Sequence, residues 1–227
     1  MQYPTATQVG AFTVEQNKVL RNTYMMLALT MIPTVVGAFV GMSTNFSFMA
    51  ESPIMSALLM FGAMMGMMFA VSALRNSVWG IAALLGFTFV AGVFLGPILQ
   101  VALHFSNGAQ LIGLAAGGTG IIFFSLATIA TVTKKDFSFM GKFLFIGLIL
   151  LIVASLANLF FQIPAMSLTL SSIAVLIFSA FILYDVSRIV HGGETNYVMA
   201  TMGLFMSIYN LFISLLQLLM AFSGERD

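Results

Sequence analysis

The chain has 227 residues, of which 60% are hydrophobic and only 7% charged, and its formal net charge at pH 7 is +1. Soluble globular domains average about a quarter charged residues, so water is not the main solvent of this chain, and its charge gives no reason to expect a nucleic-acid partner. It contains no cysteine, which excludes disulfides and thiolate metal sites.

Seven apolar runs, separated by short polar breaks, follow one another along the chain. A helix needs about 20 residues to cross the hydrocarbon of a bilayer, and each run reaches this length. We expect spans at roughly residues 22–43, 54–74, 78–102, 109–133, 139–161, 165–188 and 197–222. The runs do not alternate as barrel strands would. The sequence therefore predicts an all-α membrane protein with one seven-helix bundle.

The first 21 residues are polar and carry Glu15, Lys18 and Arg21. We interpret residues 1–21 as a cytoplasmic tail and residues 22–227 as the membrane domain, with no second domain. Positive residues near span ends resist translocation. Seven lie in the tail or near the second, fourth and sixth breaks, against Arg226 alone on the other side: Lys18, Arg21, Arg75, Lys134, Lys135, Lys142 and Arg188. This bias predicts a cytoplasmic N-terminus and a periplasmic C-terminus.

Small residues recur at helical spacing in the third and fourth spans. Gly92 and Gly96 form one pair four residues apart, and Gly113 and Gly117 form another. Such pairs let helix backbones approach closely, so each serves either packing within the bundle, which is the commoner use, or a dimer face. Pro33 and Pro97 should kink the first and third spans.

The last span carries a polar stripe along one face. Its members are spaced three or four residues apart: Asn196, Ala200, Gly203, Ser207, Asn210, Ser214 and Gln217. Amides and hydroxyls that faced lipid would lack partners, so the stripe should face the bundle interior, an aqueous cavity or another protein. Interhelical hydrogen bonding and a hydrated interior both fit this pattern.

The stretch "YDVSRIVHGGETNY" joins the sixth and seventh spans. Asp185 falls in the last turns of a helix, where the negative end of the macrodipole disfavours a carboxylate by about 0.3 to 1 kcal/mol. Either Arg188 or Arg75 pairs with it, or Asp185 is a titratable, gating group. Gly192 and Gly193 should end the sixth helix, and Thr195 or Asn196 should cap the seventh.

Four stretches carry a resemblance to a known family: "KVLRNTY" from Lys18, "TKKDFSFMG" from Thr133, "HGGETNY" from His191 and "SIYNLFISLL" from Ser207. In these the chain resembles the Bax inhibitor family of seven-helix membrane proteins, and most closely its bacterial YccA-like branch. The connector motif includes His191, Gly192, Gly193, Glu194 and Asn196. The resemblance covers nearly the whole chain.

The resemblance implies two functions. Some family members are pH-sensitive calcium leak pathways, in which aspartates of helices six and seven share a proton and an arginine of helix two latches them. The first aspartate matches Asp185, the second falls on Ser207, and Arg75 is the candidate arginine. A serine gives neither the raised pKa nor the paired oxygens of two adjacent carboxylates, so that mechanism does not carry over intact to Ca²⁺ or H⁺.

The YccA-like branch implies instead a multi-pass protein of the bacterial inner membrane that binds and restrains the membrane-anchored AAA protease FtsH. The polar tail fits this function, since such a protease grips an exposed end. An enzyme is not expected, because the sequence has no His-Glu-x-x-His motif and no paired intramembrane aspartates. We expect no cofactor and no metal site.

Overall fold

A computed structural model describes residues 6–47, 51–133 and 135–224, and the side chains from Gln16 onward. Lys134 and Arg226, which enter the orientation argument, lie outside the described residues. Helices make up almost all of the described chain, and seven of them are long and apolar enough to span a membrane. The predicted fold class is confirmed.

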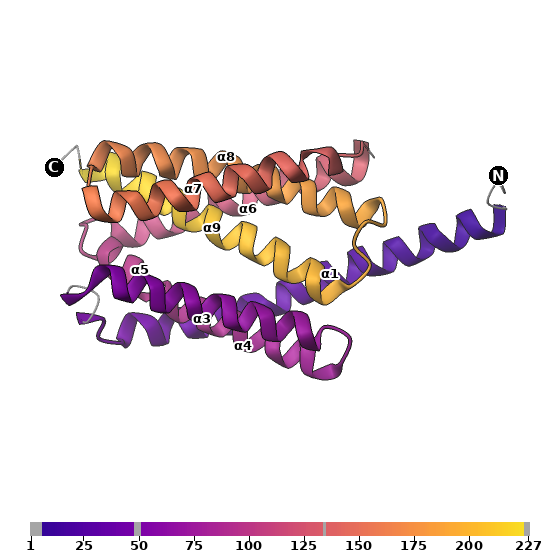
Figure 1. Ribbon diagram of the computed structural model, residues 1–227, viewed down its shortest axis with the longest axis horizontal. Coiled ribbons are helices and arrows are strands. Elements are labelled where there is room, and N and C mark those ends of the chain that lie inside the picture. The colour runs from indigo at the N-terminus through magenta and orange to yellow at the C-terminus, as the bar shows by residue number, and fades with distance from the viewer. Residues whose placement is uncertain (1–5, 48–50, 134, 225–227) are drawn as a thin grey trace.

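Figure 1 shows the helices lying side by side in an elongated bundle. They are α1 (Ala6–Ser43), α3 (Pro53–Leu74), α4 (Val78–Phe94), α5 (Gly96–Leu103), α6 (Gly108–Thr133), α7 (Gly141–Phe161), α8 (Pro164–Val190) and α9 (Tyr197–Gly224). α4 and α5 together form the third span, and the short 3₁₀ turn η1 (Ser138–Met140) precedes α7. Each predicted span agrees with a helix to within a few residues, apart from the start of the first.

The first span begins earlier than the sequence pattern indicates. α1 runs without interruption from Ala6 to Ser43, so most of the polar tail is a helical continuation of the span. In Figure 1 the N-terminal part of α1 projects beyond the other helices. The residues become apolar after residue 21, but the helix itself continues across this point.

α9 is the central helix of the bundle. It packs against α8 and α6 on one side and against α1, α3, α4 and α5 on the other (Figure 1). Its apolar side chains Leu204, Phe205, Leu211 and Leu216 are fully buried. α7, by contrast, packs mainly on α8 and turns most of its apolar residues outward, where lipid chains would cover them.

The two glycine pairs behave differently. A Cβ added to Gly92 would overlap the carbonyl oxygen of Thr34, and one added to Gly96 would come within 2.5 Å of the backbone of Gly41. This pair therefore lets α1 cross close to α4 and α5, as expected for packing within the bundle. A Cβ on Gly113 or Gly117 would have no described atom within 4 Å.

The predicted kink of the third span lies at Leu95, where α4 ends and α5 begins, two residues before Pro97. Beyond it, Gln100 reaches across to the end of α1. Its Nε2 donates to the carbonyl oxygens of Gly41 at 3.3 Å, Met42 at 2.9 Å and Thr44 at 2.9 Å. Carbonyls at a helix C-terminus lack partners within the helix, so Gln100 caps α1 from another span.

Candidate functional site

The candidate site lies at the end of the bundle where α8 ends and α9 begins, which we call the Arg188 end. α8 closes in a glycine turn: Gly192 adopts a φ of 75°, and the N–H of Gly193 donates to the carbonyl of Arg188 at 2.8 Å. Only glycine takes this left-handed conformation freely. The two glycines thus end the helix in the predicted manner and turn the chain toward α9.

Asp185 lies one turn before this end and faces α9. The hydroxyl of Ser207 is 3.3 Å from its Oδ2 and also 3.2 Å from the carbonyl of Gly203, one turn earlier. A Cβ on Gly203 would lie 3.5 Å from Oδ2 and 3.8 Å from Oδ1. The glycine therefore makes room for the carboxyl group, and the serine donates a hydrogen bond to it.

Neither arginine considered for Asp185 forms an ion pair with it among the described residues. Arg188 turns the other way: its Nη2 donates to the carbonyl of Gly193 at 3.2 Å and lies 3.5 Å from Glu194 Oε2. Its guanidinium carbon is also 5.5 Å from the centre of the Tyr184 ring, within the range of a cation–π contact. Arg188 therefore holds the glycine turn in place.

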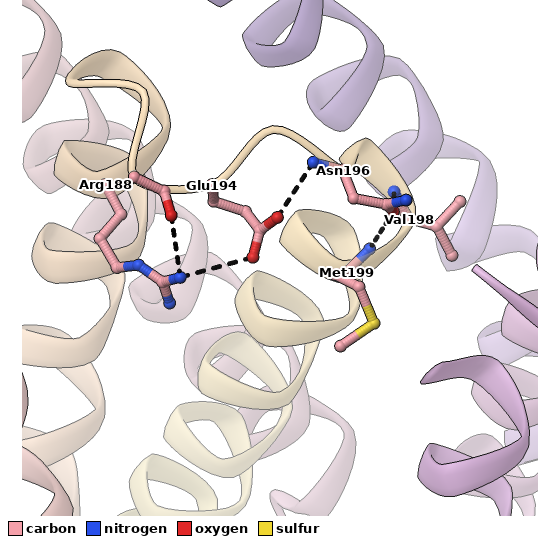
Figure 2. Close-up of polar contacts among 6 residues, drawn as sticks. Arg188, Glu194, Asn196, Val198 and Met199 are labelled. Atoms are coloured by element: carbon pink, nitrogen blue, oxygen red, sulfur yellow. Dashed lines mark hydrogen bonds and ion pairs between the residues drawn. The ribbon is translucent and has the colours of Figure 1, made fainter. Parts of the chain in front are cut away.

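Glu194 and Asn196 continue this network, as Figure 2 shows. Glu194 Oε1 accepts the N–H of Asn196 at 3.0 Å, so the carboxylate links Arg188 to the start of α9. Asn196 Oδ1 then accepts the N–H groups of Val198 at 3.0 Å and Met199 at 3.1 Å. Of the two predicted caps, Asn196 is the one that caps α9.

The same Asn196 side chain ties the connector to the opposite half of the bundle. Its Nδ2 donates to the carbonyl of Arg75 at 3.1 Å and to Asn76 Oδ1 at 2.9 Å, in the corner between α3 and α4. The side chain of Arg75 itself is exposed. Arg75 therefore contacts the site through its backbone carbonyl and not through its side chain, which the sequence pattern cannot predict.

The polar stripe of α9 lies inside the bundle for part of its length. Ser207 and Ser214 are buried, and Asn210 is half-buried. Two members bond to α8: Ser207 contacts Asp185, and Gln217 Oε1 accepts the hydroxyl of Ser171 at 2.8 Å. Asn210 and Ser214 instead donate to backbone carbonyls one turn earlier in α9. Interhelical and local hydrogen bonds thus both serve the stripe.

A second connector, between α6 and η1, is attached to the end of α8. Ser187 Oγ accepts the N–H of Phe137 at 2.9 Å and lies 3.3 Å from the carbonyl of Lys135, while His191 Nδ1 is 2.8 Å from the carbonyl of Ser187. Hydrogen bonds from Ser138 hold the pKa of the exposed Asp136 below its usual range. Asp136 lies within the family stretch "TKKDFSFMG", but the sequence pattern predicts neither its hydrogen bonds nor those of Ser187.

Comparison with known proteins places this geometry in a family. The sequence profile described as "Inhibitor of apoptosis-promoting Bax1" matches residues 16–224, which is nearly the whole chain. The chain belongs to the Bax inhibitor family. The matched range includes α8, the glycine connector and α9, and therefore Asp185 and Asn196.

Bacterial relatives cover almost the whole chain. The Escherichia coli K12 protein named "Modulator of FtsH protease YccA" is 39% identical over 203 residues, which are 89% of this chain and 90% of that protein. The Pseudomonas aeruginosa protein PA2604 is 41% identical over 96% of this chain and 97% of its own length, and is named uncharacterized. A second Escherichia coli relative, 39% identical, is named "Inner membrane protein YccA". This chain is accordingly a multi-pass inner-membrane protein.

Proposed function

We propose that this protein binds the membrane-anchored AAA protease FtsH and modulates its degradation of membrane proteins. The observation that carries the proposal is the 39% identity, over 89% of the chain, to a protein named as a modulator of that protease. The Escherichia coli K12 relative is named as a modulator, and a regulatory role without catalysis is part of the proposal.

Two structural features support a binding role at the Arg188 end. The connector between α8 and α9 is fixed by hydrogen bonds that Arg188 donates and that Glu194 and Asn196 accept, so it presents one defined surface. A Cβ on Gly192 would lie 2.8 Å from Gln16 Nε2, so α1 passes directly beside the connector. The projecting part of α1 and the connector together form a surface that a partner could contact (Figure 1).

Co-purification tests the proposal. The tagged protein is solubilised in mild detergent from a bacterium that contains FtsH, with an unrelated seven-span protein bearing the same tag as control. We expect FtsH with this protein alone, and slower turnover of FtsH membrane substrates when it is overproduced. A parallel arm removes residues 1–15, which keeps the described contacts from Gln16 onward. Absence of FtsH from the eluate, together with unchanged substrate turnover, would refute the proposal.

A second candidate function, a pH-sensitive leak of Ca²⁺ or H⁺, is favoured by one observation. The carboxyl group of Asp185 lies between two membrane-spanning helices and contacts Ser207, where the family resemblance has its second aspartate. A carboxylate inside a helical bundle is costly and often marks an ion pathway. Because Ser207 faces it in place of a second aspartate, Asp185 would be the one carboxyl group of this contact that could gate the flux.

Flux measurements separate this candidate from a purely structural role. The protein is reconstituted in liposomes loaded with a calcium-sensitive or pH-sensitive dye, and the parent is compared with Asp185→Asn at pH 6 and pH 8. Asp136→Asn is the matched control, because Asp136 is an exposed carboxylate at the same end of the bundle. We expect a pH-dependent flux in the parent and the control that Asp185→Asn abolishes. Equal fluxes in all three proteins eliminate the gating role.

A further inference from the structure

An open cavity of about 510 Å³ lies between the start of α7 and the end of α8. Its polar lining comes from Ser138, Lys142, Tyr184, Asp185 and Arg188, and two phenylalanines, Phe145 and Phe181, line it further along the same helices. Because α7 packs mainly on α8, the cavity lies at the periphery of the bundle, where lipids surround the protein. Asp185 belongs both to this lining and to the contact with Ser207 of α9.

The cavity contains unused hydrogen-bond donors. Lys142 is exposed, and its ammonium group contacts no partner among the described residues. Arg188 uses only Nη2 for Gly193 and Glu194, which leaves its Nε and Nη1 without described partners. An arginine offers five N–H donors in a planar fork that suits phosphate, and a lysine adds a mobile positive charge. These two cations stand on adjacent helices at the same opening.

The negative groups near the cavity do not cancel these donors. Glu194 is 3.5 Å from one nitrogen of Arg188 only. Asp185 lines the cavity, but its Oδ2 accepts the hydroxyl of Ser207 at 3.3 Å and both its oxygens lie within 3.8 Å of the Cβ position of Gly203, so this carboxyl group is already engaged with α9. Asp136, on the preceding connector, accepts the N–H of Ser138 at 2.8 Å. The dipoles of the antiparallel α7 and α8 oppose each other here, so the side-chain cations decide the preference of the site.

The depth of the cavity indicates the class of ligand. Lys142 is the second residue of α7, and Arg188 lies two residues before the end of α8, so both lie at the membrane boundary. Phe145 lies about one helical turn deeper than Lys142 and Phe181 about two turns deeper than Arg188, at the level where acyl chains begin. We propose that this cavity binds the phosphate headgroup of an anionic phospholipid, with the first carbons of its chains against the two phenylalanines.

Native mass spectrometry of the detergent-solubilised protein tests the proposal. The protein is titrated with short-chain phosphatidylglycerol and, separately, with phosphatidylcholine of the same chain length. We expect one tightly bound phosphatidylglycerol and weaker binding of phosphatidylcholine. Lys142→Gln should weaken phosphatidylglycerol binding by about tenfold, the usual effect of losing a charge-assisted hydrogen bond. Arg188→Gln should weaken it as well.

Lys135→Gln is the matched control, because Lys135 is an exposed lysine at the same end that does not line the cavity. It should bind phosphatidylglycerol as the parent does. Lys142 has no described partner, so its replacement should not disturb folding, whereas Arg188→Gln also removes the contacts to the glycine turn. The proposal is overturned if Lys142→Gln binds like the parent, or if Lys135→Gln loses as much affinity, which would indicate diffuse surface attraction.

A further arm separates the lipid from a free phosphate ester. Glycerophosphoglycerol carries the same phosphodiester headgroup without acyl chains, so we expect it to compete with phosphatidylglycerol only weakly. Competition at equal concentration would overturn the assignment to a lipid, because the phenylalanines would then contribute nothing. Equal binding of the two phospholipids would overturn the assignment to an anionic headgroup.

Discussion

Two half-buried tyrosines differ in whether their hydroxyl groups find a hydrogen-bond partner within this bundle. The hydroxyl of Tyr209, on α9, donates to the carbonyl of Ala91 in α4 at 3.0 Å. The hydroxyl of Tyr24, on α1, is buried without a hydrogen-bond partner in the described part of the chain, although its ring packs edge-on against Phe123. A buried hydroxyl without a partner is unfavourable, whereas a paired one stabilises modestly.

The stability of the protein should respond differently to loss of the hydroxyl group at these two tyrosines. Tyr209→Phe is expected to lower the free energy of unfolding by about 1 kcal/mol, because the carbonyl of Ala91 loses a donor. Tyr24→Phe is expected to leave that free energy unchanged or raise it slightly. Denaturant unfolding in detergent micelles measures both variants. A larger loss for Tyr24→Phe than for Tyr209→Phe would contradict the assignment of partners.

Helices in this protein depend on caps and close crossings that other helices supply. Asn196 caps α9 and at the same time bonds to the α3–α4 corner. Gly92 lets α1 cross close to α4, whereas Gly113 on α6 faces open space. The same residue type therefore serves different purposes in neighbouring helices, and each purpose predicts a different response to substitution.

The assignment of Asn196 as the cap of α9 can be tested by comparing its substitution with that of Thr195. Asn196→Ala should destabilise the protein by about 1 to 3 kcal/mol, since it removes the cap and two hydrogen bonds to the α3–α4 corner. Thr195→Ala should change stability little, because Thr195 is exposed. Thermal unfolding in detergent compares the two variants. Equal destabilisation by both would show that Asn196 is not the cap.

The glycine pairs predict effects of opposite sign. Gly92→Ala forces a Cβ against the carbonyl of Thr34, which should destabilise the bundle by about 1 to 3 kcal/mol. Gly113→Ala has free space and should stabilise α6 by about 0.5 to 1 kcal/mol, because alanine is the better helix former. The midpoint of unfolding in micelles reports both. Destabilisation by Gly113→Ala would instead favour the dimer face.

At the scale of the whole molecule, orientation in the membrane is a prediction that rests on the positions of Lys and Arg. The absence of cysteine makes it directly testable, because each introduced cysteine is the only thiol in the protein. Ser77, in the α3–α4 corner, and Ser106, between α5 and α6, are both exposed and lie on opposite sides of the third span.

We expect a membrane-impermeant thiol reagent, applied to cells with a permeabilised outer membrane, to label Ser106→Cys and not Ser77→Cys. Disruption of the inner membrane should make Ser77→Cys reactive, which controls for its accessibility. The opposite labelling pattern would show that the predicted orientation is wrong and that the Arg188 end, with its connectors, lies in the periplasm. FtsH binding and labelling can be measured on the same variants.

The spans could be predicted from sequence because length and apolarity alone decide which segments can cross a bilayer. The glycine turn and the Asn196 cap could be predicted because they depend on local backbone geometry. Contacts between residues that are distant in the sequence could not be predicted. Whether Asp185 contacts an arginine or Ser207, and whether Arg188 contacts both Tyr184 and Glu194, depends on helix rotation and side-chain direction. The helical start of α1 could not be predicted, because the apolar pattern that marks the span does not extend into the polar residues before it.

The cap that Gln100 places on α1 bears on the order of biosynthesis. The carbonyls at the end of α1 emerge from the ribosome first, but one of their donors lies 56 residues later, beyond the whole α3–α4 hairpin. Until the third span enters the bilayer, the end of α1 must be hydrated or remain at the membrane surface. The first span of this protein therefore reaches its final hydrogen bonding only when the third has been inserted.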